Sequence, residues 1–135
     1  MNPPAVLGID PGTRKCGYAV VVESRSAPLE LGIVPTDALS GRLRELVMRF
    51  TLRAIALGGG THADAVAAVV GGLGLPVRLI DERETTLLAR RRYFSANPPR
   101  GWRRFVPRGM LLPPRPIDDF AALLIAERLL DIERP

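Results

Sequence analysis

Short apolar runs separated by glycine, proline and polar residues fill the first part of the chain. Runs of roughly four to eight apolar residues between turn residues are typical of buried strands. The pattern predicts strands at residues 6–10, 16–23 and 29–34. A tight turn at residues 11–15 would join the first two as a hairpin.

Helical and strand-like patterns then alternate. Leucines at helical spacing predict a helix over residues 36–51 with Thr36 as N-cap, and a second, short helix follows at 63–70 with Thr61 as its cap. Buried strands are predicted at 54–57 and 77–81. A helix starting at Thr85 or Thr86 runs to about residue 94, an irregular proline-rich loop covers 95–116, and a last amphipathic helix covers 117–132.

This order of elements predicts an α/β fold. Three strands in an opening meander, followed by two strands that are each reached through a helix, give a mixed five-stranded sheet flanked by helices. The first three strands would be antiparallel and the later ones parallel. Ribonuclease-H-like folds have this order, and at 135 residues the chain is expected to form a single domain over 1–135.

Composition narrows the possible partners. The net charge is +5 and the isoelectric point about 10.6, which favours an anionic partner without choosing between nucleic acid and a membrane surface. The single cysteine, Cys16, cannot form an internal disulfide and is expected to be a small buried group. The longest apolar run, 65–77, is interrupted by glycines and Pro76 and is too short to span a bilayer. Without a secretory signal, we expect a soluble cytoplasmic protein with no membrane partner.

Carboxylates recur at the ends of predicted elements. Asp10 ends the first strand, Asp81 and Glu82 end the fifth, and the pair Asp118 and Asp119 opens the last helix. If the first and fifth strands are parallel, their ends meet at one edge of the sheet. Neighbouring strand residues face opposite sides, which favours Glu82 pointing inward. Neighbouring helical residues are about 100° apart, so only one residue of the aspartate pair can face such a site.

Carboxylates gathered in one place repel one another and suit a divalent cation with hard oxygen ligands, Mg²⁺ or Mn²⁺. Two such ions about 4 Å apart can activate water and stabilise the leaving oxygen of a phosphodiester. With one histidine and one cysteine in the chain, a structural zinc site is not expected. Each acid alone has a structural alternative, as a turn-starting Asp10, a surface Glu82 paired with Arg83, and helix-start aspartates.

The segments "LGIDPGTRKCGYAVV", "LIDERETT" and "IDDFAALLI" together resemble the YqgF family, the RuvC-like Holliday-junction resolvase homologues also described as pre-16S rRNA nucleases. The resemblance runs over nearly the whole chain. It implies Asp10, Glu82 and Asp118 as catalytic residues and metal ligands. The segment 57–66 is shorter than is usual in the family. Ala121 stands where RuvC resolvases carry a further aspartate.

Basic residues concentrate before the last helix. Between Thr85 and Ile117 the chain has eight arginines and no acid, so the rest of it carries a net −3. Three aromatic residues, Tyr93, Trp102 and Phe105, are interleaved with these arginines and could stack on bases. A solvated surface loop is the alternative. The predicted nucleic-acid contacts are Lys15, Arg83, Arg91, Arg100, Trp102, Arg103, Arg104 and Arg108.

Two smaller features stay open. The Gly58–Gly60 run is followed by no Gly-Lys-Ser/Thr and so forms no Walker motif, and it is expected to allow a tight turn or a close approach to phosphate. His62 either contacts solvent at a helix start or acts as a base or phosphate ligand.

Together these features favour a metal-dependent nuclease that acts on structured or single-stranded RNA or DNA, in pre-16S rRNA processing or Holliday-junction processing. A catalytically silent nucleic-acid-binding module is the first alternative. The second is an ATP-binding protein of the actin and sugar-kinase type, for which 135 residues leave no second lobe. Monomer and homodimer both remain open.

Overall fold

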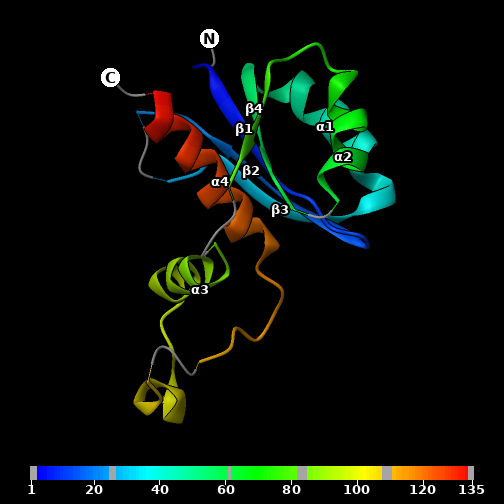
Figure 1. Ribbon diagram of the computed structural model, residues 1–135. Coiled ribbons are helices and arrows are strands. Elements are labelled where there is room, and N and C mark those ends of the chain that lie inside the picture. The colour runs from blue at the N-terminus through cyan, green and yellow to red at the C-terminus, as the bar shows by residue number, and fades with distance from the viewer. Residues whose placement is uncertain (1–2, 25–26, 61, 82–84, 108–110, 134–135) are drawn as a thin grey trace.

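The computed structural model describes residues 3–24, 27–60, 62–81, 85–107 and 111–133 (Figure 1). Its centre is a five-stranded sheet in the order β3-β2-β1-β4-β5. The strands are β1 (Ala5–Asp10), β2 (Lys15–Val21), β3 (Glu30–Pro35), β4 (Leu52–Gly58) and β5 (Val77–Ile80). β2 pairs antiparallel with both β1 and β3, whereas β4 runs parallel to β1 and β5 parallel to β4. The predicted mixed sheet is confirmed.

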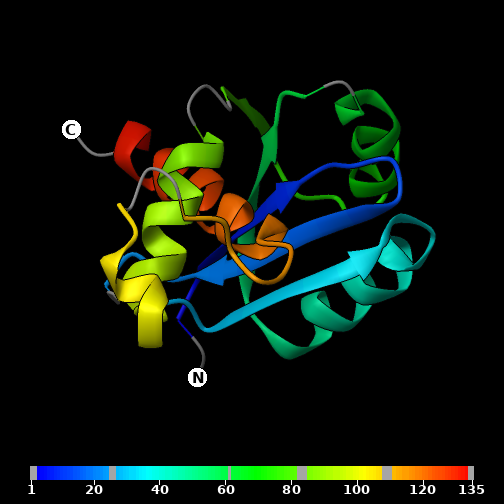
Figure 2. The same ribbon diagram turned by 90° about the horizontal axis from the view of Figure 1, so that it is seen from below.

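Helices cover both faces of this sheet (Figure 2). On one face lie α1 (Leu39–Arg49), which follows the short 3-10 helix η1 (Thr36–Ala38), and α2 (Ala63–Gly71). On the other face lies α4 (Asp118–Glu133), with α3 (Thr85–Ala96) packed against it. A second 3-10 helix, η2 (Gly101–Phe105), projects beyond α3, away from α1 and α2 (Figure 1).

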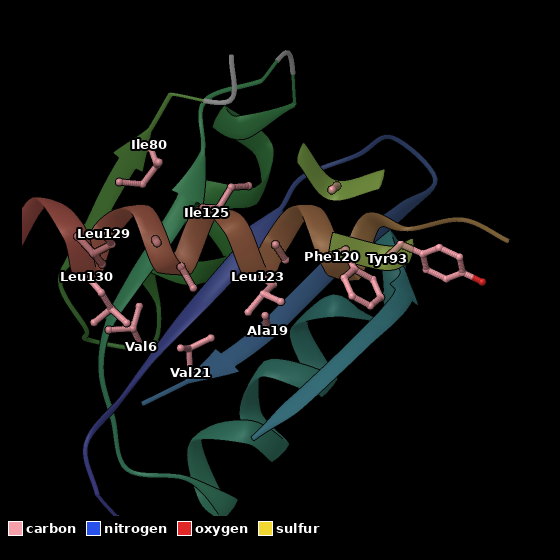
Figure 3. Packing of buried hydrophobic residues seen from close by; sticks show 14 of the residues in the cluster. Val6, Ala19, Val21, Ile80, Tyr93, Phe120, Leu123, Ile125, Leu129 and Leu130 are labelled. Carbon is pink, nitrogen blue, oxygen red and sulfur yellow. The ribbon is translucent and has the colours of Figure 1, made fainter. Parts of the chain in front are cut away.

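Strict alternation along the central strands divides the core into two layers. In β1, Val6 packs in the cluster beneath α4 (Figure 3), whereas Leu7 and Ile9 pack in the cluster beneath α1 and α2. Successive strand residues face opposite sides, so a strand covered on both faces reads as one apolar run. The same alternation fixes the side to which any further residue of β1 points.

Two local expectations differ from the structure, and a third concerns a residue that the structure does not describe. The Thr36 hydroxyl does not cap a helix; it donates to the carbonyl of Gly12 at 2.8 Å, because η1 brings it against the turn after β1. The predicted cap Thr61 lies outside the described residues, and α2 begins after His62 with no side-chain cap. The loop predicted as irregular contains η2, because a single 3-10 turn needs no periodic apolar pattern.

α4 crosses β1 in direct backbone contact. A Cβ at Gly8 would overlap the carbonyl oxygen of Ala122 and lie 2.8 Å from the Cβ of Ala126. Glycine within a strand often marks such a close approach. The absence of a side chain at this position therefore sets how near α4 lies to the sheet.

We expect Gly8→Ala to lower the free energy of unfolding by about 1–3 kcal/mol, because the added methyl group forces α4 away from β1. Urea denaturation followed by circular dichroism measures this. Gly41→Ala is the matched control, since a Cβ at this α1 position meets nothing within 4 Å. It should stabilise the protein by about 0.5–1 kcal/mol. Equal stability of the Gly8→Ala variant and the wild type would contradict the close packing.

Candidate active site

The carboxyl ends of the three parallel strands lie at one edge of the sheet. β1 ends at Asp10, β4 at Gly58 and β5 at Ile80, and the Gly59 N–H donates to the Ile80 carbonyl at 3.0 Å. β4 lies between β1 and β5, so the ends of those two strands are about 10 Å apart. The predicted common edge for the first and fifth strands is confirmed.

Asp10 and the backbone of Asp118 both lie next to Gly17 at this edge. Since Val6 and Gly8 face α4, alternation places the half-buried Asp10 on the same face. Its Cα partner in β2 is Gly17, and a Cβ there would overlap the backbone carbonyl of Asp118. The first turn of α4 therefore lies against the residue directly opposite Asp10.

A lysine pairs with Asp118 at this edge. Lys15 begins β2 two residues before Gly17 and lies on the same face of the sheet, and its Nζ is 3.3 Å from the Oδ2 of Asp118. The side chains of Lys15 and Asp118 are 46% and 30% exposed. Because both groups reach solvent, this ion pair can be exchanged for contacts with a bound ion or anion at little cost in stability.

The neighbouring Asp119 has a different environment. Its side chain is buried, its Oδ1 accepts the Phe120 N–H at 2.9 Å, and both of its oxygens accept from the Arg115 guanidinium at 3.2–3.3 Å. These contacts tie the loop before α4 to the helix start. Of the two adjacent aspartates, Asp119 is held by the protein itself, and Asp118 faces Lys15 at the edge.

Thr36 holds the turn that follows Asp10 through two hydrogen bonds. Thr36 donates its N–H to the Arg14 carbonyl at 2.9 Å and its hydroxyl to the Gly12 carbonyl. The Cys16 thiol is buried between the same Gly12 carbonyl and the Thr36 hydroxyl, as expected for a small buried group. A residue that is 26 positions from Asp10 thus fixes its turn, and no local sequence signal identifies such a contact.

His62 contacts the same turn. Its Nε2 forms a hydrogen bond with the Thr13 hydroxyl, which links the start of α2 to the turn between β1 and β2. The contact is exposed. His62 therefore lies beside the candidate site, in contact with a turn residue.

The third predicted ligand cannot be placed. Glu82 and Arg83 lie outside the described residues. Asp81 is exposed, and its carbonyl accepts a hydrogen bond from Arg128 of α4. Within the ranges that the structure describes, no group of three or more acidic, histidine or cysteine side chains could hold a metal ion. The site as described consists of two carboxylates and one ammonium group.

The arginine-rich segment divides into docked and exposed parts. Arg92 pairs with Glu127 of α4 at 2.6 Å, and Arg103 donates to the Leu112 carbonyl. Arg91, Arg100 and Arg104 are exposed. Arg108 lies outside the described residues.

Of the three aromatic residues expected to stack on bases, one is unavailable. Tyr93 is buried and packs edge-on against Phe94 and Phe120, because α3 packs this face against α4. The prediction for Tyr93 is therefore wrong. Trp102 and Phe105 are 74% and 77% exposed, as a stacking role requires.

Comparison with known proteins agrees with this architecture. Residues 6–56 match the family model described as crossover junction endodeoxyribonuclease RuvC. The chain is 31% identical to a protein of Pelotomaculum thermopropionicum named "Putative pre-16S rRNA nuclease", over 93% of this chain and 86% of that protein. Thermus thermophilus RuvC, alone and in complex with a Holliday junction substrate, superposes with a TM-score of 0.55 at 20% identity, covering 96% of both chains.

The fold is thus ribonuclease-H-like, and the class of protein is a nuclease that acts on nucleic acid. More narrowly, the chain belongs to the YqgF family of RuvC-like pre-16S rRNA nucleases. No helix in the described ranges is long and apolar enough to cross a bilayer.

The two adjacent aspartates should differ in their effect on stability. Asp119→Ala should lower the free energy of unfolding by about 1–3 kcal/mol, because the buried Phe120 N–H loses its acceptor. Asp118→Ala should cost about 1 kcal/mol or less, since it removes only a partly exposed ion pair. Urea denaturation of both variants measures the difference. A larger loss for Asp118→Ala would reverse the two assignments.

Proposed function

We propose that this protein is a divalent-metal-dependent nuclease whose catalytic carboxylates are Asp10, Glu82 and Asp118. The observation that carries the proposal is the contact of Asp118 with Gly17, the residue paired with Asp10. This contact brings the backbone of Asp118, more than a hundred positions along the chain, next to the residue that is paired with Asp10. Carboxylates gathered in one place repel one another and suit a bound cation, which supports the proposal.

The donor set fits Mg²⁺ or Mn²⁺. Asp10 and Asp118 offer hard carboxylate oxygens, and Glu82 would supply a third from the segment that follows β5. The Lys15 ammonium lies 3.3 Å from the Asp118 carboxylate and offsets part of the negative charge at this edge. A pair of bound ions would supply an activated water and stabilisation of the leaving oxygen.

In this reaction the side chains of the protein would position the carboxylate oxygens and the substrate phosphate. Asp10 and Asp118 hold their oxygens on one face because β1 and α4 are in backbone contact. Lys15 exchanges its contact with Asp118 for a non-bridging oxygen of the scissile phosphate. Water adds to phosphorus and loses a proton to solvent, the bond to the leaving sugar oxygen breaks, and that oxygen takes up a proton from solvent.

We favour a ribosomal RNA precursor as the substrate. The relative named as a pre-16S rRNA nuclease aligns with 93% of this chain at 31% identity, whereas the resemblance to RuvC at 20% identity supports the fold alone. A cytoplasmic location follows from that substrate. Holliday junctions are the alternative substrate, and a comparison of matched RNA and DNA substrates separates the two.

We expect Asp10→Asn to reduce cleavage by roughly 100-fold or more, because metal-ion stabilisation of the transition state supplies several kcal/mol. Asp118→Asn and Glu82→Gln should behave alike. Without metal, the Asp10→Asn protein should melt at the same temperature as the wild type or higher, since carboxylate repulsion is relieved. The assay is cleavage of matched RNA and DNA in Mg²⁺, Mn²⁺ or chelator.

Glu45→Gln serves as the control for loss of one negative charge, because Glu45 lies on α1 across the sheet from Asp118. It should cleave at the wild-type rate. An Asp10→Asn protein that also cleaves at that rate would remove the proposed metal site. Nucleic-acid binding without cleavage by the wild type in any metal would instead favour the silent binding module.

We also expect Arg103 and Arg104 to neutralise one backbone phosphate each. Each lost contact should reduce the slope of log affinity against log salt by about 0.7 on single-stranded RNA, so the double alanine variant should lose roughly 1.4. Salt titrations in Ca²⁺ measure the slope. Arg104→Ala alone, which leaves the Arg103–Leu112 contact in place, should lose about 0.7.

The exposed Arg44 of α1, across the sheet from α4, is the matched control. Arg44→Ala should leave the slope unchanged. If the Arg103 and Arg104 variants also keep the wild-type slope, the loop is a solvated surface with no phosphate contact.

A further inference from the structure

The η2 turn (Gly101–Phe105) carries two exposed aromatic rings three residues apart. Trp102 and Phe105 are three residues apart, and residues i and i+3 of a 3-10 helix lie above one another on the same side. At about 2 Å of rise per residue, their backbones are separated by roughly 6 Å along the axis. The turn therefore presents both rings in one direction.

The residues next to this turn include two that pack in the core. Directly after it, Val106 packs against the cluster beneath α4, and Leu111 on the return segment is only 3% exposed. The base of the projection is thus anchored in the core, and Trp102 and Phe105 remain 74% and 77% exposed on a fixed support. A segment that buries Leu111 yet leaves two larger rings in solvent has the form of a binding surface.

The charge around the rings selects the kind of ligand. Arg104 places its guanidinium 4.9 Å from the centre of the Phe105 ring, and Arg100 is exposed at the start of the turn. No acid occurs between Thr85 and Ile117. Planar aromatic faces beside arginines match a ligand that is both planar and anionic, which describes unpaired nucleotides. A duplex hides its base faces in the stack and offers only phosphates and groove edges.

We propose that Trp102 and Phe105 form a stacking site for unpaired bases, so that the substrate carries a single-stranded segment. The inference rests on the proposed nuclease function and narrows its substrate. Arg100 and Arg104 hold the phosphates that flank the stacked bases.

Trp102 is the only tryptophan of the chain, so its fluorescence reports on the turn alone. The experiment titrates the Asp10→Asn protein, in chelator, with a single-stranded RNA of about 12 nucleotides and with a duplex of the same sequence. We expect saturable quenching by the single strand and little by the duplex. Phe105→Ala should weaken single-strand binding roughly 5-fold or more.

Three further variants separate stacking from structure. Binding of the same RNA, measured by anisotropy of a labelled strand, should fall in Trp102→Ala and be largely retained in Trp102→Phe. Met48→Ala removes an equally exposed apolar side chain, 88% exposed on α1, and should change nothing. Thermal melts of the Trp102 and Phe105 variants should match that of the wild type, because both rings lie in solvent.

Several results would overturn the stacking site. These are equal quenching by duplex and single strand, no quenching by either, an emission shift that depends on protein concentration alone, and a shift caused only by anionic phosphatidylserine vesicles. The third indicates a second copy of the chain as the occupant and the fourth a membrane surface. Cleavage by the wild type without quenching overturns the stacking site alone, whereas quenching without cleavage overturns the nuclease proposal alone.

Discussion

The backbone contact between α4 and the first two strands is the constraint on which the rest of the molecule depends. Gly8 and Gly17 leave no room for a side chain between the sheet and the helix, so α4 rests directly on β1 and β2. The register of β1 with β2 places Gly17 opposite Asp10. One packing event therefore builds the apolar layer beneath α4 and also brings Asp118 to the β2 residue opposite Asp10.

Several charged side chains before and within α4 serve this packing. Arg115 holds Asp119 and lies over the rings of Tyr93 and Phe120, and Arg92 of α3 pairs with Glu127. These arginines dock α3 and the preceding loop onto α4. The arginines between Thr85 and Ile117 therefore fall into two groups. Arg92 and Arg115 are paired with acids of α4, whereas Arg100 and Arg104, at η2, are exposed to solvent.

The edge with Asp10 is supported by residues from several elements. Thr36 and Cys16 hold the turn after β1 from within the fold, and His62 contacts it from the start of α2. A metal-binding carboxylate needs this kind of support, because its oxygens must keep their positions when charge accumulates beside them. The residues proposed for catalysis are few, but the geometry that aligns them involves both faces of the sheet.

The order of strands and helices, the class of fold and the position of Asp10 at a strand end can all be inferred from the sequence, because periodicity and turn chemistry are local properties. The sequence also showed that only one of Asp118 and Asp119 could face a site, since neighbouring helical residues diverge by about 100°. Only the tertiary structure decided which one. Arg115 and the Phe120 N–H hold Asp119 in the protein, and Lys15 meets Asp118 at the edge. Glu82 stays a prediction from the resemblance. Tyr93 and Trp102 have similar sequence contexts, but Tyr93 is buried and Trp102 is exposed. The difference depends on whether another helix covers the ring, which is a long-range contact that no local pattern encodes.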